Sequence, residues 1–285
     1  MLLSKVTFFF LLTSLCLFIS PKRVLAGEFD ETEKRVISLN SLGADIVSKL
    51  DNDSLVGIPG SSLLKKDVIF SDKVIVSEGR MPPSLEKIIK LKPSLVIGSE
   101  GFHDKILDRL EDINIETLKT NTKSIKQLEI LIKDLALYLK KNPKPIKEKI
   151  KSCYFKTSKY RGSAVILASI KPLLSPNSNT WAGHLLERFN FDNISKNLES
   201  KTEFRGYVNL SPEIILKKKP SKIIVISFPG MNQNTLLANP ILKKIKTSNK
   251  NEIVSFNYYG LINPGSLKTI NNACEKLSNI ERNLI

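Results

Sequence analysis

One stretch of this chain occurs twice: residues 84–97 read SLEKIIKLKPSLVI, and residues 211–224 read SPEIILKKKPSKII. Eight of the 14 positions are identical at a constant spacing of 127 residues, where ordinary amino-acid usage gives roughly one match by chance. Each copy begins with a serine that can cap a helix, continues as a short helix, and reaches a proline that ends the helix before an apolar strand. The repeat therefore predicts two lobes of similar topology.

Apolar strands alternate with amphipathic helices on both sides of each copy. Strands are expected at residues 35–39, 54–58, 73–76, 95–98, 115–118, 163–168, 222–227 and 253–256. Helices are expected at residues 41–50, 84–91, 104–110, 180–189, 212–218, 240–246 and 266–280. This alternation favours an α/β fold in which each lobe is a mostly parallel sheet covered by helices.

A helical connection is expected between the lobes. Residues 122–140 have the apolar spacing of a helix, and residues 146–160 read as a second helix after a break at residues 142–145. In parallel α/β sheets ligands bind beside the loops that follow the strands, so the two lobes should enclose a ligand cleft. The predicted boundaries are a signal peptide at 1–26, an N-terminal lobe at 27–122, a helical connection with the interlobe helix at 123–161 and a C-terminal lobe at 162–285.

The N-terminal segment predicts export. Lys5 precedes an apolar run of about 14 residues, which is short beside the ~20 residues that span a bilayer. Val24 and Ala26 occupy the −3 and −1 positions of a signal-peptidase site, so cleavage is expected near Ala26. The alternatives are an uncleaved anchor and a lipoprotein acylated at Cys16, for which Leu15 is a poor preceding residue. We expect a soluble periplasmic protein rather than a membrane-tethered one.

The charge balance is strongly basic, with 44 Lys and Arg against 28 Asp and Glu in 285 residues, a net charge of +16. Such an excess suits a nucleic acid, an anionic membrane or an anionic ligand, and a lysine bias throughout the chain explains it equally. The sequence contains no recognised nucleic-acid motif, and export opposes that role, so we expect no nucleic-acid partner. It also lacks the P-loop, G-x-S-x-G and H-E-x-x-H motifs, and we therefore do not expect an enzyme.

Two cysteines remain beyond the signal peptide, Cys153 and Cys274. They can form one disulfide in an oxidising compartment or stay as two buried thiols. The only histidines, His103 and His184, are too far apart in the sequence to suggest a His-rich metal site. His103 follows a strand and is a candidate metal ligand, although an exposed polar residue would look the same. His184 lies within a helix and is expected to be structural.

Five segments together resemble the substrate-binding proteins of ABC importers for cobalamin, iron–siderophore and haem-type chelates. They read RVISLNSLGADIVSKL from residue 35, DSLVGI from 53, PSLEKIIKLKPSLVIGSEG from 83, WAGHLLERFNFDNIS from 181 and YVNLSPEIILKKKPSKIIVIS from 207. The resemblance implies two α/β lobes joined by one long helix, and docking of Glu86 and Glu213 onto arginines of a membrane permease. Pairing with the helix dipole also explains an acid in the first turn of each repeat helix. We expect a monomer without a cofactor of its own.

Aromatic residues and two arginines gather in the loops that follow the predicted strands. The candidate ligand-binding residues are Arg80, Phe102, Trp181, Arg205, Tyr207, Phe228, Tyr258 and Tyr259. Rings can stack on a flat chelate, and Arg80 and Arg205, which precede the two repeat helices, can read its anionic groups. Solvated loop charges and ordinary packing are the alternatives.

The expected function is the solute-binding component of an ABC importer. It would capture a metal chelate of iron–siderophore, cobalamin or haem type between the lobes and deliver it to the permease. A chelatase-like enzyme with two α/β lobes and a transport protein for divalent metal ions are the alternatives.

Overall fold

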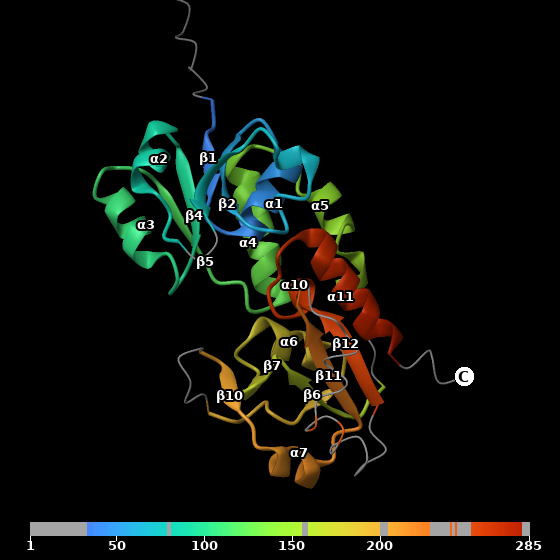
Figure 1. The fold of residues 1–285 in the computed structure, drawn as a ribbon. Helices are drawn as coiled ribbons and strands as arrows, with labels where there is room; N and C mark the ends of the chain where they lie inside the picture. The colour runs from blue at the N-terminus through green and yellow to red at the C-terminus, as the bar shows by residue number, and fades with distance from the viewer. Residues whose placement is uncertain are drawn as a thin grey trace, which may run out of the picture. The chain divides into compact units, whose positions relative to one another are not determined.

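The computed structural model describes residues 33–78, 81–155, 159–199, 205–228, 240, 243 and 252–280. The predicted signal peptide and the candidate ligand residue Arg80 lie outside these ranges, and so does most of the helix expected at 240–246. Within the described ranges, the chain forms two α/β lobes joined by a helical connection (Figure 1).

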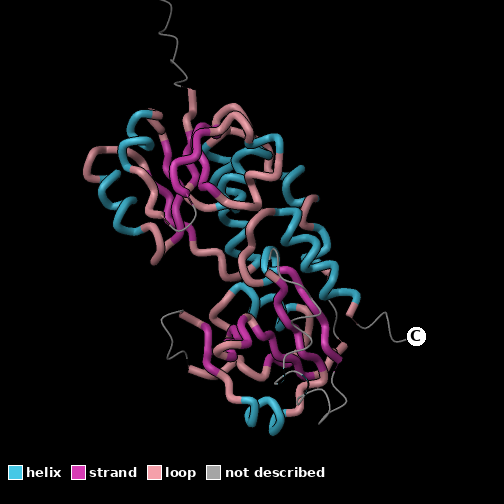
Figure 2. Tube along the Cα trace, in the orientation of Figure 1, coloured by secondary structure: helices cyan, strands magenta, loops and turns pink. Residues whose placement is uncertain are grey.

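The N-terminal lobe is built on a parallel five-stranded sheet with the order β3-β2-β1-β4-β5. The strands are β1 (Val36–Ser38), β2 (Leu55–Gly60), β3 (Val74–Glu78), β4 (Leu95–Ser99) and β5 (Thr117–Thr120). The helical elements are α1 (Ser41–Leu50), η1 (Val68–Phe70), α2 (Leu85–Lys90) and α3 (Asp104–Glu111). Helices cover both faces of this sheet (Figure 2), as the long apolar runs of its strands predict.

The C-terminal lobe contains two sheets. The parallel sheet has the order β12-β11-β6-β9, and a second, antiparallel sheet has the order β10-β8-β7. The strands are β6 (Ser163–Leu167), β7 (Ser169–Ile170), β8 (Leu173–Pro176), β9 (Asp192–Asn193), β10 (Tyr207–Asn209), β11 (Lys222–Ser227) and β12 (Glu252–Asn257). The helices are α6 (Trp181–Arg188), α7 (Pro212–Lys218), α10 (Tyr258–Leu261) and α11 (Leu267–Asn279). The sequence pattern did not predict the short antiparallel strands.

The two copies of the repeat adopt the same local structure. The Ser84 hydroxyl accepts the N–H of Lys87 at the start of α2, and the Ser211 hydroxyl accepts the N–H of Ile214 at the start of α7, both at 3.3 Å. After the helices, Lys92 and Lys219, which are 127 residues apart, both have a left-handed backbone, with φ of 47° and 45°. The repeat thus encodes the cap, the helix and its termination in each lobe.

The connection between the lobes differs in part from the prediction. Its first half is α4 (Ile125–Tyr138), a 14-residue helix capped by Ser124. Its second half, expected as one helix, instead consists of α5 (Lys144–Glu148) and the 3₁₀ turn η2 (Lys151–Tyr154). The N–H groups of Ile150 and Cys153 bond three residues back rather than four, which is the tighter 3₁₀ pattern.

One apolar core continues through both lobes. Alternate residues of the central strands enter it: Val36 and Ile97 from the N-terminal sheet, and Ile166 and Ile224 from the C-terminal sheet. Their strand neighbours point to the opposite faces, into two smaller clusters under α2–α3 and under α7. Helix α4 adds buried residues to the shared core, so the lobes are joined by packing as well as by the chain.

A disulfide bond links Cys153 of η2 to Cys274 of α11 across 121 residues. This resolves the choice that the sequence left open, and it ties the end of the connection to the last helix. Among the described helices, none combines the length and the apolar character that crossing a membrane requires.

Candidate functional site

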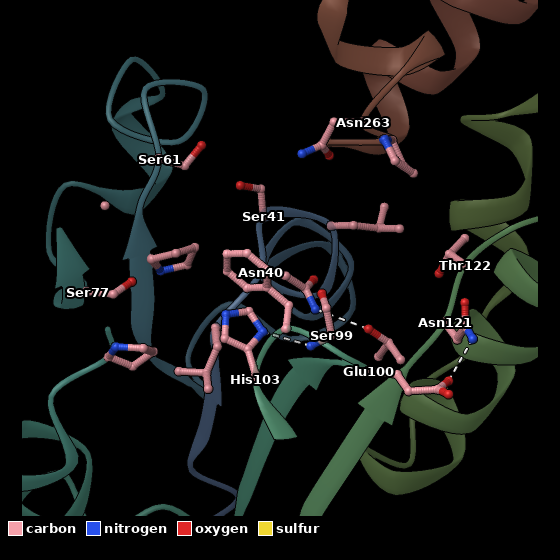
Figure 3. Close-up of a pocket in the computed structure, with 18 of the residues that line it drawn as sticks. Asn40, Ser41, Ser61, Ser77, Ser99, Glu100, His103, Asn121, Thr122 and Asn263 are labelled. Atoms are coloured by element: carbon pink, nitrogen blue, oxygen red, sulfur yellow. Dashed lines mark hydrogen bonds between the residues drawn. The ribbon is translucent and has the colours of Figure 1, made fainter. Parts of the chain in front are cut away.

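A cleft of about 990 Å³ lies at the carboxyl ends of the N-terminal strands (Figure 3). Its N-terminal wall comes from the segments that follow β1, β2, β4 and β5, together with Met81, Pro82 and Pro83. Its C-terminal wall consists of Tyr207, Tyr258, Tyr259, Ile262, Asn263 and Pro264. The cleft therefore lies between the lobes, at the place where parallel α/β sheets bind ligands.

Neutral hydrogen-bonding groups dominate the polar part of the N-terminal wall. The Asn40 amide donates to the Thr120 hydroxyl at 3.1 Å, and that hydroxyl donates to the Gly98 carbonyl at 2.9 Å. The side-chain Oδ1 of Asn40 in turn accepts the Gly43 N–H at 2.8 Å, which caps α1. This chain of bonds fixes the ends of β1, β4 and β5 to one another, so the wall is preorganised.

Glu100 and His103 add titratable groups to the same wall. The Asn121 amide donates to the Glu100 carboxylate at 2.6 Å. The Nδ1 atom of His103 accepts the backbone N–H of Ser99 at 2.8 Å, and the residue is only 7% exposed. Burial lowers the pKa of His103, and the neighbouring Asp104 carboxylate opposes this effect. The ring is therefore held neutral and in one orientation.

The C-terminal wall is aromatic. The rings of Tyr258 and Phe228 stack with centroids 5.1 Å apart, and the Tyr259 ring meets Tyr258 edge-on at 5.3 Å. Burial raises the pKa of both Tyr207 and Tyr258, so their hydroxyls stay protonated and can donate hydrogen bonds. The Tyr259 hydroxyl lies 3.4 Å from the Ser62 hydroxyl of the other lobe. These rings offer flat apolar surface with polar edges.

Buried polar contacts hold the aromatic wall in place. The indole N–H of Trp181 donates to the carbonyl of Gly260 at 2.8 Å. Gly260 has φ of 98°, and a Cβ there would lie 2.0 Å from the Thr269 carbonyl oxygen, so this position needs glycine. The buried carboxylate of Asp45 on α1 accepts the first N–H of α11, from Leu267, at 2.8 Å. The segment that carries Tyr258 and Tyr259 is thus anchored to both lobes.

The structure brings together half of the eight predicted ligand residues. Phe102, Tyr207, Tyr258 and Tyr259 line the cleft, and Phe102 is 84% exposed. Phe228 stacks on Tyr258 but is not among the residues that line the cleft.

Arg80 lies outside the described residues, and the other two predicted ligand residues, Trp181 and Arg205, do not line the cleft. Trp181 is 4% exposed and packs in the shared core, because its side chain faces inward from the first turn of α6. Arg205 is exposed and is not among the residues that line the cleft. The lining also includes residues 120–122 and 262–264, which the sequence reasoning missed. Residues 120–122 follow the strand predicted at 115–118, so the rule that ligands bind beside the loops after strands could have found them.

Glu86 and Glu213, the predicted docking residues, occupy the first turns of α2 and α7. Both side chains are exposed, and neither residue lines the cleft. The two acids therefore sit in equivalent helix positions, one in each lobe, apart from the candidate ligand site.

The described residues contain no group of three or more His, Cys, Asp or Glu side chains that could hold a metal ion. His103 and Glu100 both line the cleft. One imidazole nitrogen of His103 is already used by Ser99. The polar groups that the lining offers are mainly hydroxyls and amides, which suit the organic part of a ligand.

Several solved structures share this fold. An ABC transporter substrate-binding protein from Listeria monocytogenes is 19% identical with a TM-score of 0.66, and the match covers 87% of this chain and 98% of that one. CeuE of Helicobacter pylori in a Ni-His complex is 18% identical with a TM-score of 0.66, covering 86% and 82%. The vitamin B12 binding protein BtuF of Vibrio cholerae is 17% identical with a TM-score of 0.61, covering 86% and 95%.

At the level of sequence, no curated protein matches this chain. The family model of periplasmic binding proteins matches residues 36–257, which include the central strands of both lobes and most of the cleft. With the two lobes and the cleft between them, this match shows that the chain belongs to the periplasmic binding protein family.

Proposed function

We propose that this protein is the solute-binding component of an ABC importer that captures a metal chelate in the periplasm. The observation that carries the proposal is the cleft, which sets a wall of neutral hydrogen-bonding groups against a wall of tyrosine rings. A chelate with a flat or aromatic organic part uses both walls at once, by stacking on one and by hydrogen bonding to the other.

The size of the cleft favours a large ligand. Its volume of about 990 Å³ is at the upper end of the ~300–1,000 Å³ that small-molecule sites occupy. A bare divalent cation instead needs several carboxylate, imidazole or thiolate ligands that converge on one point. The hydroxyls, amides and rings of the lining suit the organic shell of a chelate better than they suit a naked ion.

Two further observations support the proposal. The similar Vibrio protein binds vitamin B12 and the similar Helicobacter protein forms a Ni-His complex, and both ligands are metal complexes of organic molecules. The Cys153–Cys274 disulfide suits an oxidising compartment such as the periplasm, in agreement with the predicted signal peptide.

Delivery to the membrane is the second part of the proposal. Glu86 and Glu213 extend from matched helices of the two lobes, both exposed and outside the cleft. Exposed carboxylates that face permease arginines would guide association and orient the protein without contacting the chelate.

The test is a fluorescence titration of the exported protein with cyanocobalamin, haemin, ferric desferrioxamine B and nickel–histidine. Trp181 is the only tryptophan in the sequence, and its bond to the Gly260 carbonyl places it next to the aromatic wall. One of the four chelates should bind with micromolar or tighter affinity. Free Ni²⁺ and Zn²⁺ are the controls, and tighter binding of a free ion than of every chelate would contradict the proposal.

A further inference from the structure

His103 combines deep burial with a place in the lining of the cleft. We infer that its Nε2–H group is a hydrogen-bond donor to an acceptor atom on the organic part of the chelate, and that His103 does not ligate the metal. This inference rests on the proposed function, because it assigns a role within the same site.

The hydrogen bond to Nδ1 fixes the position of the ring proton. The partner of Nδ1 is the backbone N–H of Ser99 at 2.8 Å, and a backbone N–H can only donate. The Nδ1 lone pair must therefore accept, and the proton of a neutral imidazole must lie on Nε2. Burial lowers the pKa of His103 against the opposing charge of Asp104, which favours this neutral form.

Contacts with Ser99, Gly98 and Phe102 hold the His103 ring in place. The backbone N–H of His103 donates to the Ser99 carbonyl at 2.9 Å, so the two residues are bonded to each other twice. A Cβ on Gly98 would lie 2.9 Å from the His103 Cβ, so only glycine allows the strand to approach this closely. The Phe102 ring packs edge-on against the imidazole at 4.9 Å.

The Nε2–H group of His103 remains available to a ligand. His103 is 7% exposed and lines the cleft, and within the described part of the chain Nε2 has no hydrogen-bond partner. Figure 3 shows the imidazole beside the Ser99 backbone, with its second nitrogen turned away from it. A bound ligand excludes water from this N–H, and a ligand that offers no acceptor therefore leaves it unpaired.

Metal ligation requires a ring nitrogen with a free lone pair. One lone pair is occupied by Ser99, and the other nitrogen carries the proton. An acceptor oxygen, such as a carbonyl or a carboxylate of the chelate, binds without changing either condition. The geometry therefore points to recognition of the organic shell, which does not depend on the metal inside it.

The test compares His103→Ala with His103→Gln, whose amide keeps an N–H donor but is a poor metal ligand. Binding of cyanocobalamin, haemin, ferric desferrioxamine B and nickel–histidine is measured by calorimetry, and absorption spectra are recorded for the complexes. For the chelate that binds best, alanine should weaken Kd about tenfold, the value of one hydrogen bond to a buried group. Glutamine should stay within about threefold, and the spectrum of the bound chelate should not change.

Three results would overturn the inference. These are a spectral change with both variants, equal binding by the alanine variant and the wild type, or a ring proton found on Nδ1 by ¹⁵N NMR of the unliganded protein. His184→Gln is the matched control, because His184 is half-buried on α6 and does not line the cleft. If no chelate binds the wild type, the proposed function fails instead, and the NMR result still decides the position of the proton.

Discussion

The two lobes share one plan and differ at the edge of their sheets. The strand order β2-β1-β4-β5 of the N-terminal lobe recurs as β9-β6-β11-β12 in the C-terminal lobe. In the first lobe β3, the strand before the repeat helix, extends the parallel sheet. In the second lobe β10 takes that place in the chain but pairs with the inserted β7–β8 hairpin. The repeated sequence thus specifies the centre of each lobe and leaves the edges free to diverge.

The same divergence separates the two walls of the cleft. The N-terminal lobe contributes most of the amides and hydroxyls, together with an imidazole and the Phe102 ring, whereas the C-terminal lobe contributes three tyrosines and Asn263. Most of the hydrogen-bonding groups and most of the ring surface therefore come from different lobes, and a ligand must contact both lobes to use both.

The equivalence is tested most strongly at Glu86 and Glu213. We expect the double variant Glu86→Lys with Glu213→Lys to abolish uptake of the chelate, because reversed charges repel the permease arginines that the family resemblance implies. The Kd for the chelate should stay within about threefold, which is less than about 0.7 kcal/mol. Uptake by whole cells and calorimetry on the purified protein are the two measurements.

Single reversals sharpen this test. If the lobes dock equivalently, Glu86→Lys and Glu213→Lys should each reduce uptake by a similar factor. Glu275→Lys is the control, since Glu275 is exposed on α11 and outside both repeats. Normal uptake by the double variant would show that the matched acids serve only the helix dipole.

A second prediction concerns the disulfide, which has no counterpart within the N-terminal lobe, since both cysteines come after it. Replacing Cys153 and Cys274 by alanine should lower the free energy of unfolding by about 2–5 kcal/mol, because the bond closes a long loop in the unfolded chain. Urea denaturation of the variant measures the loss, and hydrogen exchange locates it. Exchange should accelerate most in η2 and α11, and an unchanged denaturation midpoint would contradict the prediction.

The sequence predicted the centres of the lobes better than the site. Val36, Ile97, Ile166 and Ile224 lie in apolar runs that only a strand covered on both faces can bury. By contrast, Trp181 has the same sequence signature whether it faces the core or the cleft, and only packing against Gly260 places it inside. Nothing in the sequence around His103 shows that its ring turns back onto the N–H of Ser99. Helix periodicity also could not show that η2 winds as a 3₁₀ turn.

The aromatic wall gives the third prediction. Tyr258→Leu removes a ring that stacks on Phe228 and meets Tyr259, and it should weaken binding of the chelate about tenfold, or about 1.4 kcal/mol. Tyr258→Phe keeps the ring and should remain within about threefold, provided that stacking matters more than the hydroxyl. Calorimetry with the chelate that binds best makes the comparison. Equal losses in both variants would assign the role to the hydroxyl and would remove the contrast between the two walls.

The smallest effect concerns the two histidines, one in each lobe. Burial lowers the pKa of both His103 and His184, with Asp104 opposing it in the first case and Arg188 adding to it in the second. The folded state therefore binds fewer protons than the unfolded state near the ordinary histidine pKa of ~6.5. The contribution of the two histidines to the free energy of unfolding is complete above that pH. It is lost as the pH falls through the lowered pKa values of the folded state. His103 must also give up the Ser99 bond, because a charged ring only donates.

Thermal melts between pH 8 and pH 5 separate the two contributions. Carboxylates also titrate in acid, so the informative quantity is the difference in Tm between the wild type and each single variant, His103→Gln or His184→Gln. Each substitution should make the decline of Tm below pH 6.5 shallower. The double variant should show the sum of the two changes, because the two histidines lie in different lobes and share none of the contacts described above. A steeper decline in either variant would mean that the wild-type ring is protonated in the folded state. For His103, that result would also remove the neutral donor from the cleft.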